Sequence, residues 1–559
     1  MASMIQALPS EVVNLIAAGE VIDSLAAVVR ELVENSLDAG ATRIVISLYP
    51  QQWRVRIADN GCGMNLVDLQ QAAVAHTTSK ISHCEDLWQI TSLGFRGEAL
   101  HSLTTLADLE ILSREANSLA GGWRVVYGDG GKTLALEAAA IAPGTVVTVS
   151  NLFGNWSFRR QGLPSIAQQM KATQATIYQI ALCHPHVTWQ VWHNDREWFT
   201  LSPATTTSQL LCQIVPQVNK SDLQELKLEI PNRTKSTLNL VLGLPDRCHR
   251  HRPDWVRLAV NGRMVKLPEL EQTILAGFHK TLPRDRYPVC FVHLQIPPEQ
   301  INWNRHPAKT EIYLQELTYW QEQISAAIEQ ALRLNSTHLT LEFHNSRVSQ
   351  LIKAAEEKGG YKVNRSISPK PIQKAAQSTP HFLKAVAQVN NTYIVAEHPG
   401  GLWLVEQHIA HERVLYEQLC DNWQLVPVEP PIILNNLSPA QIEQLQRIGL
   451  EIEPFGEQIW AVRTVPAMLH SRSDCSAAIL ELSWGGDLKS AQVAVACRSA
   501  IRNGTHLSLQ EMQTILDEWQ STRSPRTCPH GRPIYLSLEE SALARYFRRH
   551  WVIGKSHGI

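Results

Sequence analysis

Acidic and amide side chains recur at helical spacing close to the N-terminus of the chain. Glu31, Asn35 and Asp38 stand at positions i, i+4 and i+7, so a helix places all three on one face. A carboxylate one turn away from a carboxamide suits a general base beside a ligand for a hard cation. The same spacing also fits an ordinary solvated polar face, so this helix alone leaves both interpretations open.

Two glycine-containing turns further along the chain can bring backbone amides close to a ligand. Asp59 ends a strand pattern and is followed by Gly61 and Gly63, which allow close backbone approach, although a plain hairpin turn has the same residues. The stretch Gly94-Phe95-Arg96-Gly97 leads into a helical run, and free amides at a helix N-terminus bind phosphate. The helix and the two turns together, in this order, indicate a phosphate-binding site.

Thiol, imidazole and carboxylate groups occur in the last third of the sequence. His408 and Glu412 share one face of a helix expected over residues 406–417, and Cys528 and His530 point the same way if their backbone is extended. Cys497 is a further candidate donor. Such a set suits Zn²⁺ or a transition metal in its place. Buried cysteines and capping histidines explain the same residues without a metal.

Hydrophobic spacing predicts the elements that must position the N-terminal residues. Apolar residues at helical spacing indicate a helix over Ser24–Asp38 that ends at Gly40. Alternating residues indicate strands around 44–48, 55–57 and 145–149. Two strands after one helix, in place of a strict β-α-β order, predict an α/β sandwich with a mixed sheet.

Length and periodicity divide the chain into modules. The chain has 559 residues, whereas a single hydrophobic core stops growing at roughly 250–300 residues. We expect a first domain over residues 1–204 and a smaller α+β domain over 205–334 that closes with a helix from residue 315. A basic flexible linker over 335–381 and a third domain over 382–559 follow. Residues 345–380 of the linker carry seven basic and two acidic residues, which suits contact with nucleic-acid phosphates.

The overall composition is that of a globular protein, with 44% hydrophobic and 18% charged residues. The formal net charge of −1 provides no global field, so a nucleic-acid partner would have to be met by local patches. Ten cysteines without a secretory leader predict the reducing cytosol, and no run of 18 apolar residues predicts a membrane span.

Five stretches of the first domain closely resemble the MutL family of DNA mismatch-repair proteins. They are residues 16–21, 31–41, 59–63, 78–81 and 94–100. This family belongs to the GHKL, or Bergerat-fold, ATPase superfamily that includes gyrase and histidine kinases. The resemblance implies an α+β protein with a Bergerat-type α/β sandwich ATPase domain and a small transducer domain of a ribosomal-protein-like fold. A linker and a C-terminal α/β domain for dimerisation and endonuclease activity would follow.

The resemblance also implies an ATP and Mg²⁺ site. Glu31 would activate the attacking water as the general base, Asn35 would bind Mg²⁺, and Asp59 would accept a hydrogen bond from the adenine amino group. The other residues expected to contact the nucleotide are Gly61, Gly63, Thr78, Ser79, Lys80, Gly94, Phe95, Arg96, Gly97, Glu98, Ala99, Leu100 and Thr145.

Two basic residues of the second domain match further family motifs. Lys309, in a loop after Pro307, would reach the γ-phosphate as a point charge. Arg263, in Asn261-Gly262-Arg263, would contact the phosphate backbone of DNA in a groove. Nearby arginines would extend that patch, although a solvated surface explains them nearly as well; they are Arg247, Arg250, Arg252 and Arg257.

The C-terminal motifs resemble those of MutL proteins that carry a latent endonuclease. The match implies that His408, Glu412, Cys497, Cys528 and His530 ligate a pair of metal ions, Zn²⁺ or Mn²⁺, that activates water for phosphodiester cleavage. The family's leading aspartate is replaced by Glu406, a candidate nuclease carboxylate with a longer reach. The segment that docks on the replicative sliding clamp in the family corresponds to residues 422–427, where the leading glutamine is missing.

From this resemblance we expect an ATP-gated DNA clamp and matchmaker in mismatch repair, with a latent metal-dependent endonuclease that nicks the strand to be repaired. The alternative is an ATP-switched adaptor without nuclease activity. A type II topoisomerase subunit or a sensor kinase shares the ATPase fold, but neither fits the C-terminal metal set. The expected partners are mismatched DNA, a second copy of the chain, the mismatch-recognition protein MutS and the sliding clamp. The expected location is the cytoplasm, on the nucleoid when bound to DNA, with no membrane partner.

Overall fold

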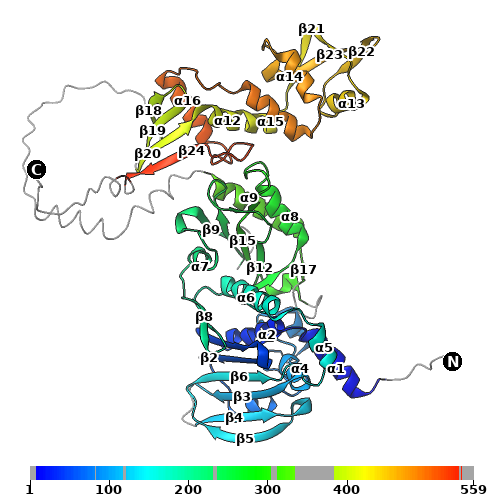
Figure 1. The fold of residues 1–559 in the computed structure, drawn as a ribbon, viewed down its shortest axis with the longest axis vertical. Helices are drawn as coiled ribbons and strands as arrows, with labels where there is room; N and C mark the ends of the chain where they lie inside the picture. Colours follow the sequence, from blue (N-terminus) through cyan, green and yellow to red (C-terminus); the bar gives the residue numbers. More distant parts are fainter. Residues whose placement is uncertain are drawn as a thin grey trace, which may run out of the picture. The chain divides into compact units, whose positions relative to one another are not determined.

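The computed structural model describes residues 8–81, 83–116, 121–230, 236–303, 311–333, 383–398, 400–540 and 543 (Figure 1). The chain divides into two compact units. The first comprises residues 1–243, 250–277 and 287–328, and the second comprises residues 244–249, 278–286 and 329–559. The predicted linker over 335–381 lies outside the described residues.

The first unit begins with a two-layer α/β sandwich around an eight-stranded sheet of order β5-β4-β3-β6-β2-β1-β7-β8. The sheet is mixed, because β1 pairs with β2 in antiparallel fashion and with β7 in parallel fashion. Its strands are β1 (Arg43–Tyr49), β2 (Arg54–Asp59), β3 (Asp108–Arg114), β4 (Gly122–Tyr127), β5 (Thr133–Ala139), β6 (Gly144–Ser150), β7 (Thr188–His193) and β8 (Arg196–Leu201). The sandwich with a mixed sheet confirms the expected fold class of this region.

Helices pack beside this sheet and supply the second layer. Figure 1 shows α2 and α6 lying side by side above the strands. Alternating residues of β1, among them Ile44, Ile46 and Leu48, are fully buried on one face of the sheet. The helices of this layer are α1 (Ser10–Val21), α2 (Leu25–Asp38), α3 (Leu66–Gln71), α4 (Ala99–Leu106), α5 (Ser157–Gly162) and α6 (Ile166–Cys183).

A second sheet of five strands, in the order β13-β12-β15-β10-β9, follows in the same unit. Its strands are β9 (Leu223–Glu229), β10 (Thr237–Gly243), β12 (Val256–Val260), β13 (Arg263–Val265) and β15 (Cys290–Gln295). The accompanying helices are α7 (Thr207–Ile214), α8 (Pro268–Gly277) and α9 (Leu317–Leu332). Two short pairs complete the region, β11 (His249–Arg250) with β14 (Tyr287–Pro288) and β16 (Ile301–Asn302) with β17 (Tyr313–Leu314). Helix α9 starts two residues later than predicted, because Glu316 has a left-handed φ of 53° that a continuing helix cannot contain.

The second unit has two hydrophobic cores. A four-stranded antiparallel sheet of order β18-β19-β20-β24 packs against α12 and α16, and a three-stranded sheet of order β21-β23-β22 packs with α13, α14 and α15. The strands are β18 (Lys384–Val389), β19 (Tyr393–His398), β20 (Gly401–Glu406), β21 (Leu425–Asn435), β22 (Ile452–Gly456), β23 (Ile459–Pro466) and β24 (Tyr535–Glu539). The helices are α12 (Gln407–Asp421), α13 (Pro439–Arg447), α14 (Cys475–Leu482), α15 (Leu488–Ser499) and α16 (Leu509–Gln520).

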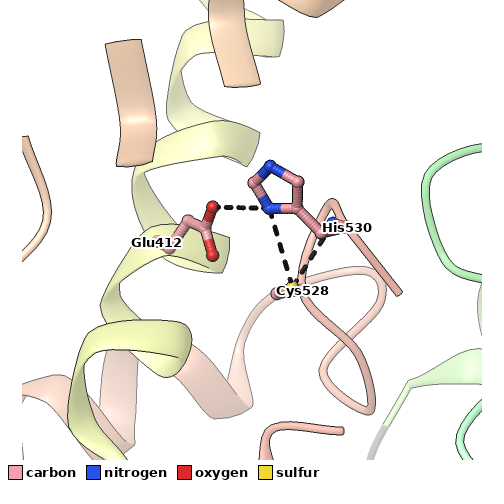
Figure 2. A group of neighbouring side chains, drawn as sticks. All are labelled: Glu412, Cys528 and His530. Atoms are coloured by element: carbon pink, nitrogen blue, oxygen red, sulfur yellow. Dashed lines mark hydrogen bonds and ion pairs between the residues drawn. The ribbon is translucent and has the colours of Figure 1, made fainter. Parts of the chain in front are cut away.

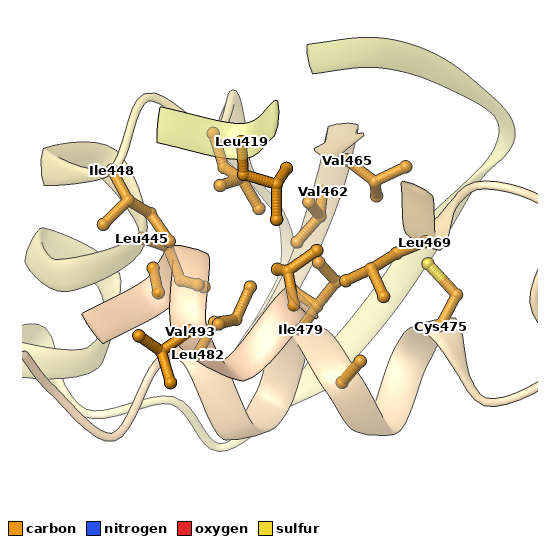
Figure 3. Close-up of a cluster of buried hydrophobic side chains, with 14 of the residues drawn as sticks. Leu419, Leu445, Ile448, Val462, Val465, Leu469, Cys475, Ile479, Leu482 and Val493 are labelled. Atoms are coloured by element: carbon orange, nitrogen blue, oxygen red, sulfur yellow. The ribbon is translucent and has the colours of Figure 1, made fainter. Parts of the chain in front are cut away.

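Helix α12 is shared between these two cores. Ala410 and Val414, in its first half, belong to the core of the four-stranded sheet. Leu419, near its end, belongs to the other core, where it lies among Leu445, Ile479 and their neighbours (Figure 3). Each fully buried leucine or isoleucine contributes roughly 1.5–3 kcal/mol to stability. Burial at both ends therefore holds the middle of α12, which carries Glu412, in one place.

Among the described residues, no single helix combines the length and apolar character that a membrane crossing requires. One bent pair, Val12–Val21 with Leu25–Asp38, passes the same test by length and composition only.

Candidate functional site

Helix α2 carries the predicted catalytic face of the first unit. The side chain of Ser24 caps its start by accepting a hydrogen bond from the Ala27 amide at 3.2 Å. Its apolar stripe is buried in the sandwich, and Glu31 is only 7% exposed. The Glu31 carboxylate accepts from Arg30 Nη2 at 3.2 Å. The predicted general base is thus a largely buried carboxylate with a cation beside it.

Asn35 and Asp38 lie one turn further along α2 and meet two other segments. Lys80 Nζ donates to Asn35 Oδ1 at 3.2 Å and to Asp38 Oδ2 at 2.5 Å. The amides of Leu93 and Gly94 donate to the Asp38 carboxylate at 2.8 and 2.9 Å. The structure therefore brings together three of the sequence motifs, 31–41, 78–81 and 94–100, around one carboxylate.

Asp59 lies at the end of β2 and faces the same helix. Its carboxylate accepts from Ser36 Oγ at 2.8 Å and from the Gly61 amide at 2.9 Å. Burial raises the pKa of Asp59, although hydrogen bonds from Gly61, Ser36 and Thr145 oppose that shift. Thr145 of β6 stands opposite Asp59 in the sheet register. Asp59 and Thr145 are therefore neighbours across β2 and β6.

Gly61 and Gly63 are required by packing of the chain itself. A Cβ on Gly63, whose φ is +68°, would lie 2.0 Å from the carbonyl oxygen of Arg114. A Cβ on Gly61 would lie 2.8 Å from the Cβ of Ala39. The structure therefore confirms that another group comes close to the backbone at these glycines. That group is a neighbouring segment of the chain.

The lid segment 94–100 packs against residues 76–80. Gly97 has a φ of +63°, and a Cβ there would lie 2.6 Å from the Thr77 carbonyl oxygen. The Gly97 carbonyl accepts from the His76 amide at 3.2 Å, and Glu98 lies 3.7 Å from His76 Nδ1. Helix α4 starts at Ala99, directly after the glycines, as predicted.

The other predicted nucleotide contacts fall on these same two segments. Thr78 Oγ1 accepts from the Lys80 amide at 3.2 Å, and Ser79 lies between them in the chain. Phe95 is buried, and the Arg96 guanidinium lies 5.9 Å from the centre of its ring. Leu100 belongs to the first turn of α4. Lys309 lies within residues 304–310, outside the described residues.

Arg263 does not have the surface position expected of a DNA contact. Its side chain is 7% exposed, and Nη2 lies 2.5 Å from Glu34 Oε2 on α2. The same nitrogen donates to the carbonyl of Leu93. The guanidinium is directed into the nucleotide domain, so a phosphate of DNA has no access to it in this structure.

The second unit brings together three of the predicted metal ligands. Glu412 projects from α12 toward a loop that carries Cys528 and His530 (Figure 2). Their ligand atoms all lie within 4.8 Å of one another. His530 Nδ1 lies 3.0 Å from Glu412 Oε1 and 4.0 Å from Cys528 Sγ. Glu412 and Cys528 are fully buried.

A tight turn gives the loop its shape. The Gly531 amide donates to the Cys528 carbonyl at 2.8 Å, and the Cys528 amide donates to the Arg532 carbonyl at 2.9 Å. The buried Arg413 side chain, next to Glu412 on α12, donates to the Thr527 carbonyl at 2.7 Å. This bond ties the loop to the helix, so the ligands from distant parts of the chain are held in register.

The ionisation of the three groups is coupled. Hydrogen bonds to Cys528 and then to Glu412 raise the pKa of His530 to about 9. Burial acts to raise the pKa of Glu412 and of Cys528, but interactions with His530 and Arg532 outweigh it and lower both pKa values. A thiolate, a carboxylate and an imidazole that meet at one point are the donor set that Zn²⁺ prefers, so these residues fit a metal.

The remaining predicted ligands lie at the edge of this group. Burial, followed by the nearby Glu412 charge, raises the pKa of the Cys497 thiol. His408 Nδ1 donates to the Ile501 carbonyl at 2.9 Å, which leaves Nε2 as its ligand atom. Glu406 is different, because its carboxylate accepts from the Ile409 amide at 2.5 Å and caps α12.

Several residues of these sites had no role in the sequence prediction. Asp38 anchors the lid, Ser36 orients Asp59, Glu34 pairs with Arg263, and Arg532 lies 3.4 Å from Glu412. A sequence signal exists for Asp38, which shares the helix face of Glu31 and Asn35, and for Arg532, which lies inside the Cys528–Pro533 motif. No local signal links Glu34 with a residue 229 positions away.

Three family models match separate stretches of the chain. Residues 23–124 match the family model "Histidine kinase-, DNA gyrase B-, and HSP90-like ATPase". Residues 215–333 match "DNA mismatch repair protein, C-terminal domain", and residues 386–507 match "MutL C terminal dimerisation domain".

Two solved structures are similar to part of the first unit. The N-terminal domain of a DNA repair protein shares 23% identity, covers 56% of this chain and 96% of its own, and has a TM-score of 0.48. The Aquifex aeolicus MutL ATPase domain complexed with ADP shares 23% identity, covers 50% and 94%, and has a TM-score of 0.36.

Full-length relatives are much more similar. The chain is 74% identical to the DNA mismatch repair protein MutL of Nostoc punctiforme and 72% identical to that of a Nostoc species, over 100% of both chains in each case. It is 62% identical to the protein of that name from Rippkaea orientalis, again over the whole of both chains. With this identity over its entire length, and with an ATPase domain and a dimerisation domain matched in order, the chain belongs to the MutL family of DNA mismatch-repair proteins.

Proposed function

We propose that this mismatch-repair ATPase works as an ATP-gated DNA clamp and matchmaker, and that its C-terminal domain contains a latent metal-dependent endonuclease. The observation that carries the endonuclease is the convergence of Glu412, Cys528 and His530, whose ligand atoms lie within 4.8 Å of one another. A carboxylate, a thiolate and an imidazole are donor types that Zn²⁺ prefers, and here they meet at one point.

The roles we propose at the ATP site follow from the partners of each side chain. Glu31 accepts a proton from the attacking water, and the Arg30 guanidinium lies 3.2 Å from its carboxylate. Asn35 binds Mg²⁺ through Oδ1, the atom that accepts from Lys80 Nζ here. Mg²⁺, when bound, neutralises charge on the phosphates. Asp59 binds adenine, residues 94–100 cover the phosphates, and Lys309 reaches the γ-phosphate.

The metal site would be held by Glu412, Cys528 and His530, with Cys497 and His408 beside them. A metal bound there supplies a Lewis acid that lowers the pKa of water and polarises a phosphodiester. The chain's own contribution is to fix the ligands: Arg413 ties the ligand loop to α12, and the Ile501 carbonyl orients His408. Zn²⁺ and Mn²⁺ are the ions we propose.

The adaptor without nuclease activity is favoured by one observation. The Glu406 carboxylate is engaged by the Ile409 amide at 2.5 Å, so it is not directed at the three ligands. If catalysis needs that carboxylate, the metal site would serve structure and the chain would recruit other proteins without cutting DNA.

A plasmid-nicking assay distinguishes the two. The full-length protein is incubated with supercoiled plasmid and Mn²⁺, beside Cys528→Ala and the matched control Cys420→Ala, whose cysteine lies at the far end of α12. Endonuclease activity predicts nicked circles with the wild type and Cys420→Ala but not with Cys528→Ala. Equally intact plasmid in all three reactions supports the adaptor.

We further propose that the outer face of the four-stranded sheet joins two copies of the chain. Its inner face covers a hydrophobic core, whereas Leu402 and Leu536 on the outer face are 37% and 58% exposed. Val395, Leu404 and Leu536 form a row across β19, β20 and β24. An apolar row of this kind on an exposed sheet suits a self-complementary interface, and the family model matched over residues 386–507 is described as a dimerisation domain.

The remaining partners are proposed from the resemblance. Because Arg263 is buried, DNA contact is assigned to the other arginines of this part of the sequence, Arg247, Arg250, Arg252 and Arg257. MutS and the sliding clamp are the proposed protein partners, and the cytoplasm, on the nucleoid, is the proposed location. Residues 425–427 of the clamp-like stretch pair with β23, so a clamp would meet them as part of a strand.

A further inference from the structure

The buried ion pair of Arg263 and Glu34 joins the five-stranded sheet to the helix of the ATP site. Arg263 opens β13, and Glu34 is the residue before Asn35 on α2. Their side chains are 7% and 5% exposed, and the two charged atoms are 2.5 Å apart. Two charges that are withdrawn from water in this way stay ionised only in a fixed and close geometry.

The turn that presents Arg263 is held on both sides by histidines, of which His293 is buried and His184 is half-buried. His184 Nε2, at the end of α6, donates to the Gly262 carbonyl at 3.0 Å. The Gly262 amide donates to His293 Nε2 at 3.0 Å. The Arg263 guanidinium also lies 5.4 Å from the centre of the Trp303 ring. Arg263 therefore projects from a rigid base.

The second contact of Arg263 reaches the start of the lid segment. Its Nη2 donates to the carbonyl of Leu93, while the Leu93 amide donates to Asp38 at 2.8 Å. Leu93 is thus held from one side by the ATP-site helix and from the other by Arg263. Gly94, which follows it, is the first residue of the lid.

A small cavity of about 90 Å³ lies at this junction, and Arg30, Glu34, Leu93 and Arg263 line it. Arg30 is also the partner of Glu31. The cation beside the proposed general base and the ion pair of Arg263 therefore line the same cavity, where a shift of one charge changes the field on the others.

We propose that Arg263 is a positioning residue for ATP hydrolysis. It acts through Glu34 to fix the rotation of α2, and through Leu93 to fix the root of the lid, so that the Glu31 carboxylate and the lid amides meet the nucleotide in register. This inference rests on the proposed role of Glu31. A misplacement of about 1 Å at a catalytic group costs on the order of a hundredfold in rate, so loss of these contacts affects turnover more than affinity.

The test compares five variants of the full-length protein with the wild type. They are Arg263→Gln, Glu34→Gln, the double variant, Arg263→Lys, and Arg124→Gln as the matched control, an arginine that pairs with Glu110 on the far sheet strands. Phosphate release gives kcat and KM, and equilibrium binding of a non-hydrolysable ATP analogue gives affinity. Thermal unfolding measures the folded fraction. The double variant removes the charges of both Arg263 and Glu34, so neither charge is left buried without its partner.

We expect each single glutamine variant to lower kcat by about tenfold to hundredfold, with KM and analogue affinity within about threefold. The double variant should be no slower than the slower single variant, because the pair acts as a unit. Arg263→Lys should recover part of the rate, and Arg124→Gln should match the wild type. If Arg263→Gln does not fold, Arg263→Lys and Glu34→Gln decide in the same assay.

Three results overturn the inference. They are a kcat within about twofold of the wild type in folded single variants, losses that add in the double variant, and losses that only follow the folded fraction. A wild-type protein without turnover, or a Glu31→Ala variant with normal turnover, overturns the proposed role of Glu31 as well. Normal wild-type turnover with unchanged Arg263 and Glu34 variants overturns this inference alone.

Discussion

The three acidic side chains on the polar side of α2 differ in their partners. Asp38 is occupied by two backbone amides and Lys80, and Glu34 by Arg263. Glu31 has its neighbour Arg30 as partner, at 3.2 Å. Because Asp38 and Glu34 hold other segments in place, Glu31 is the carboxylate of this helix that is best suited to accept a proton.

Replacement of Glu31 should separate binding from chemistry. We expect Glu31→Ala to bind ATP with nearly unchanged affinity and to lose turnover by about 10²–10⁴-fold, the range typical of general-base catalysis. An equilibrium titration and a phosphate-release assay measure the two properties. The matched control is Glu137→Ala, a largely exposed glutamate that pairs with Arg124. Steady hydrolysis by the Glu31 variant would contradict the assignment.

At the scale of elements, glycines let neighbouring segments approach each other around the site. The turn after β2 crosses the end of β3 so closely that Gly63 has no room for a side chain. Gly97 likewise has no room for a side chain, because it lies against the backbone of Thr77. Here the lid meets the segment that continues to Thr78–Lys80. A side chain at either glycine would therefore push neighbouring segments of the site apart.

Gly63→Ala should therefore be strongly destabilising. The residue has a φ of +68°, and its Cβ would lie 2.0 Å from the Arg114 carbonyl oxygen. A strained backbone of this kind costs at least about 1–3 kcal/mol, and the clash adds to it. Thermal or urea unfolding measures the loss. Gly162→Ala is the control, because no atom lies within 4 Å of a Cβ there, and it should be neutral.

The two histidines that hold Gly262 should make the stability of the first unit depend on pH. Burial lowers the pKa of both His184 and His293 from 6.5 to about 4. The hydrogen bond with Gly262 and the Asp38 charge oppose the lowering of the His184 pKa, whereas His186 adds to it. The nearby His184 adds to the lowering of the His293 pKa. Both histidines are neutral in the folded state at a pH between about 4 and 6.5, whereas in the unfolded chain they bind protons in this range. Their contribution is complete above pH 6.5 and decreases as the pH falls toward about 4.

Thermal unfolding midpoints measured between neutral pH and pH 4 test this pH dependence. His293→Gln keeps an acceptor for the Gly262 amide but does not titrate, so its midpoint should change less with pH than that of the wild type. His193→Gln, which removes a partly exposed histidine of β7, should retain the wild-type dependence. An unchanged slope in the His293 variant would show that other groups govern the acid sensitivity.

At the scale of the whole molecule, the outer face of the four-stranded sheet should control self-association. We expect Leu536→Asp, which places a charge in the apolar row, to weaken the dimer by at least about tenfold. Sedimentation velocity over a range of concentrations measures the dissociation constant. Leu509→Asp on α16 is the matched control, since Leu509 is 57% and Leu536 is 58% exposed. Equal association of both variants with the wild type would exclude this face.

Local patterns in the sequence were sufficient to predict much of the fold near the ATP site. The helix predicted over Ser24–Asp38, which starts one residue later at Leu25, the strands that flank Asp59 and the helix after Gly97 all follow from periodicity and turn chemistry. These signals are short-range, because the hydrogen bonds of a helix or turn join residues a few positions apart. The late start of α9 was missed, because nothing in the propensities indicates the left-handed Glu316.

The sequence by itself also determined which chemistry the chain carries: a carboxylate and an amide on one helix face, and a Cys, His and Glu set far downstream. Only the tertiary structure decided how these groups are used. It brings Glu412 to Cys528 and His530, and it turns Glu406 into a helix cap. It also buries Arg263 against Glu34, 229 positions away, where the sequence predicts a DNA contact. An arginine side chain has the same chemistry in either place, and its role depends on the long-range packing that surrounds it.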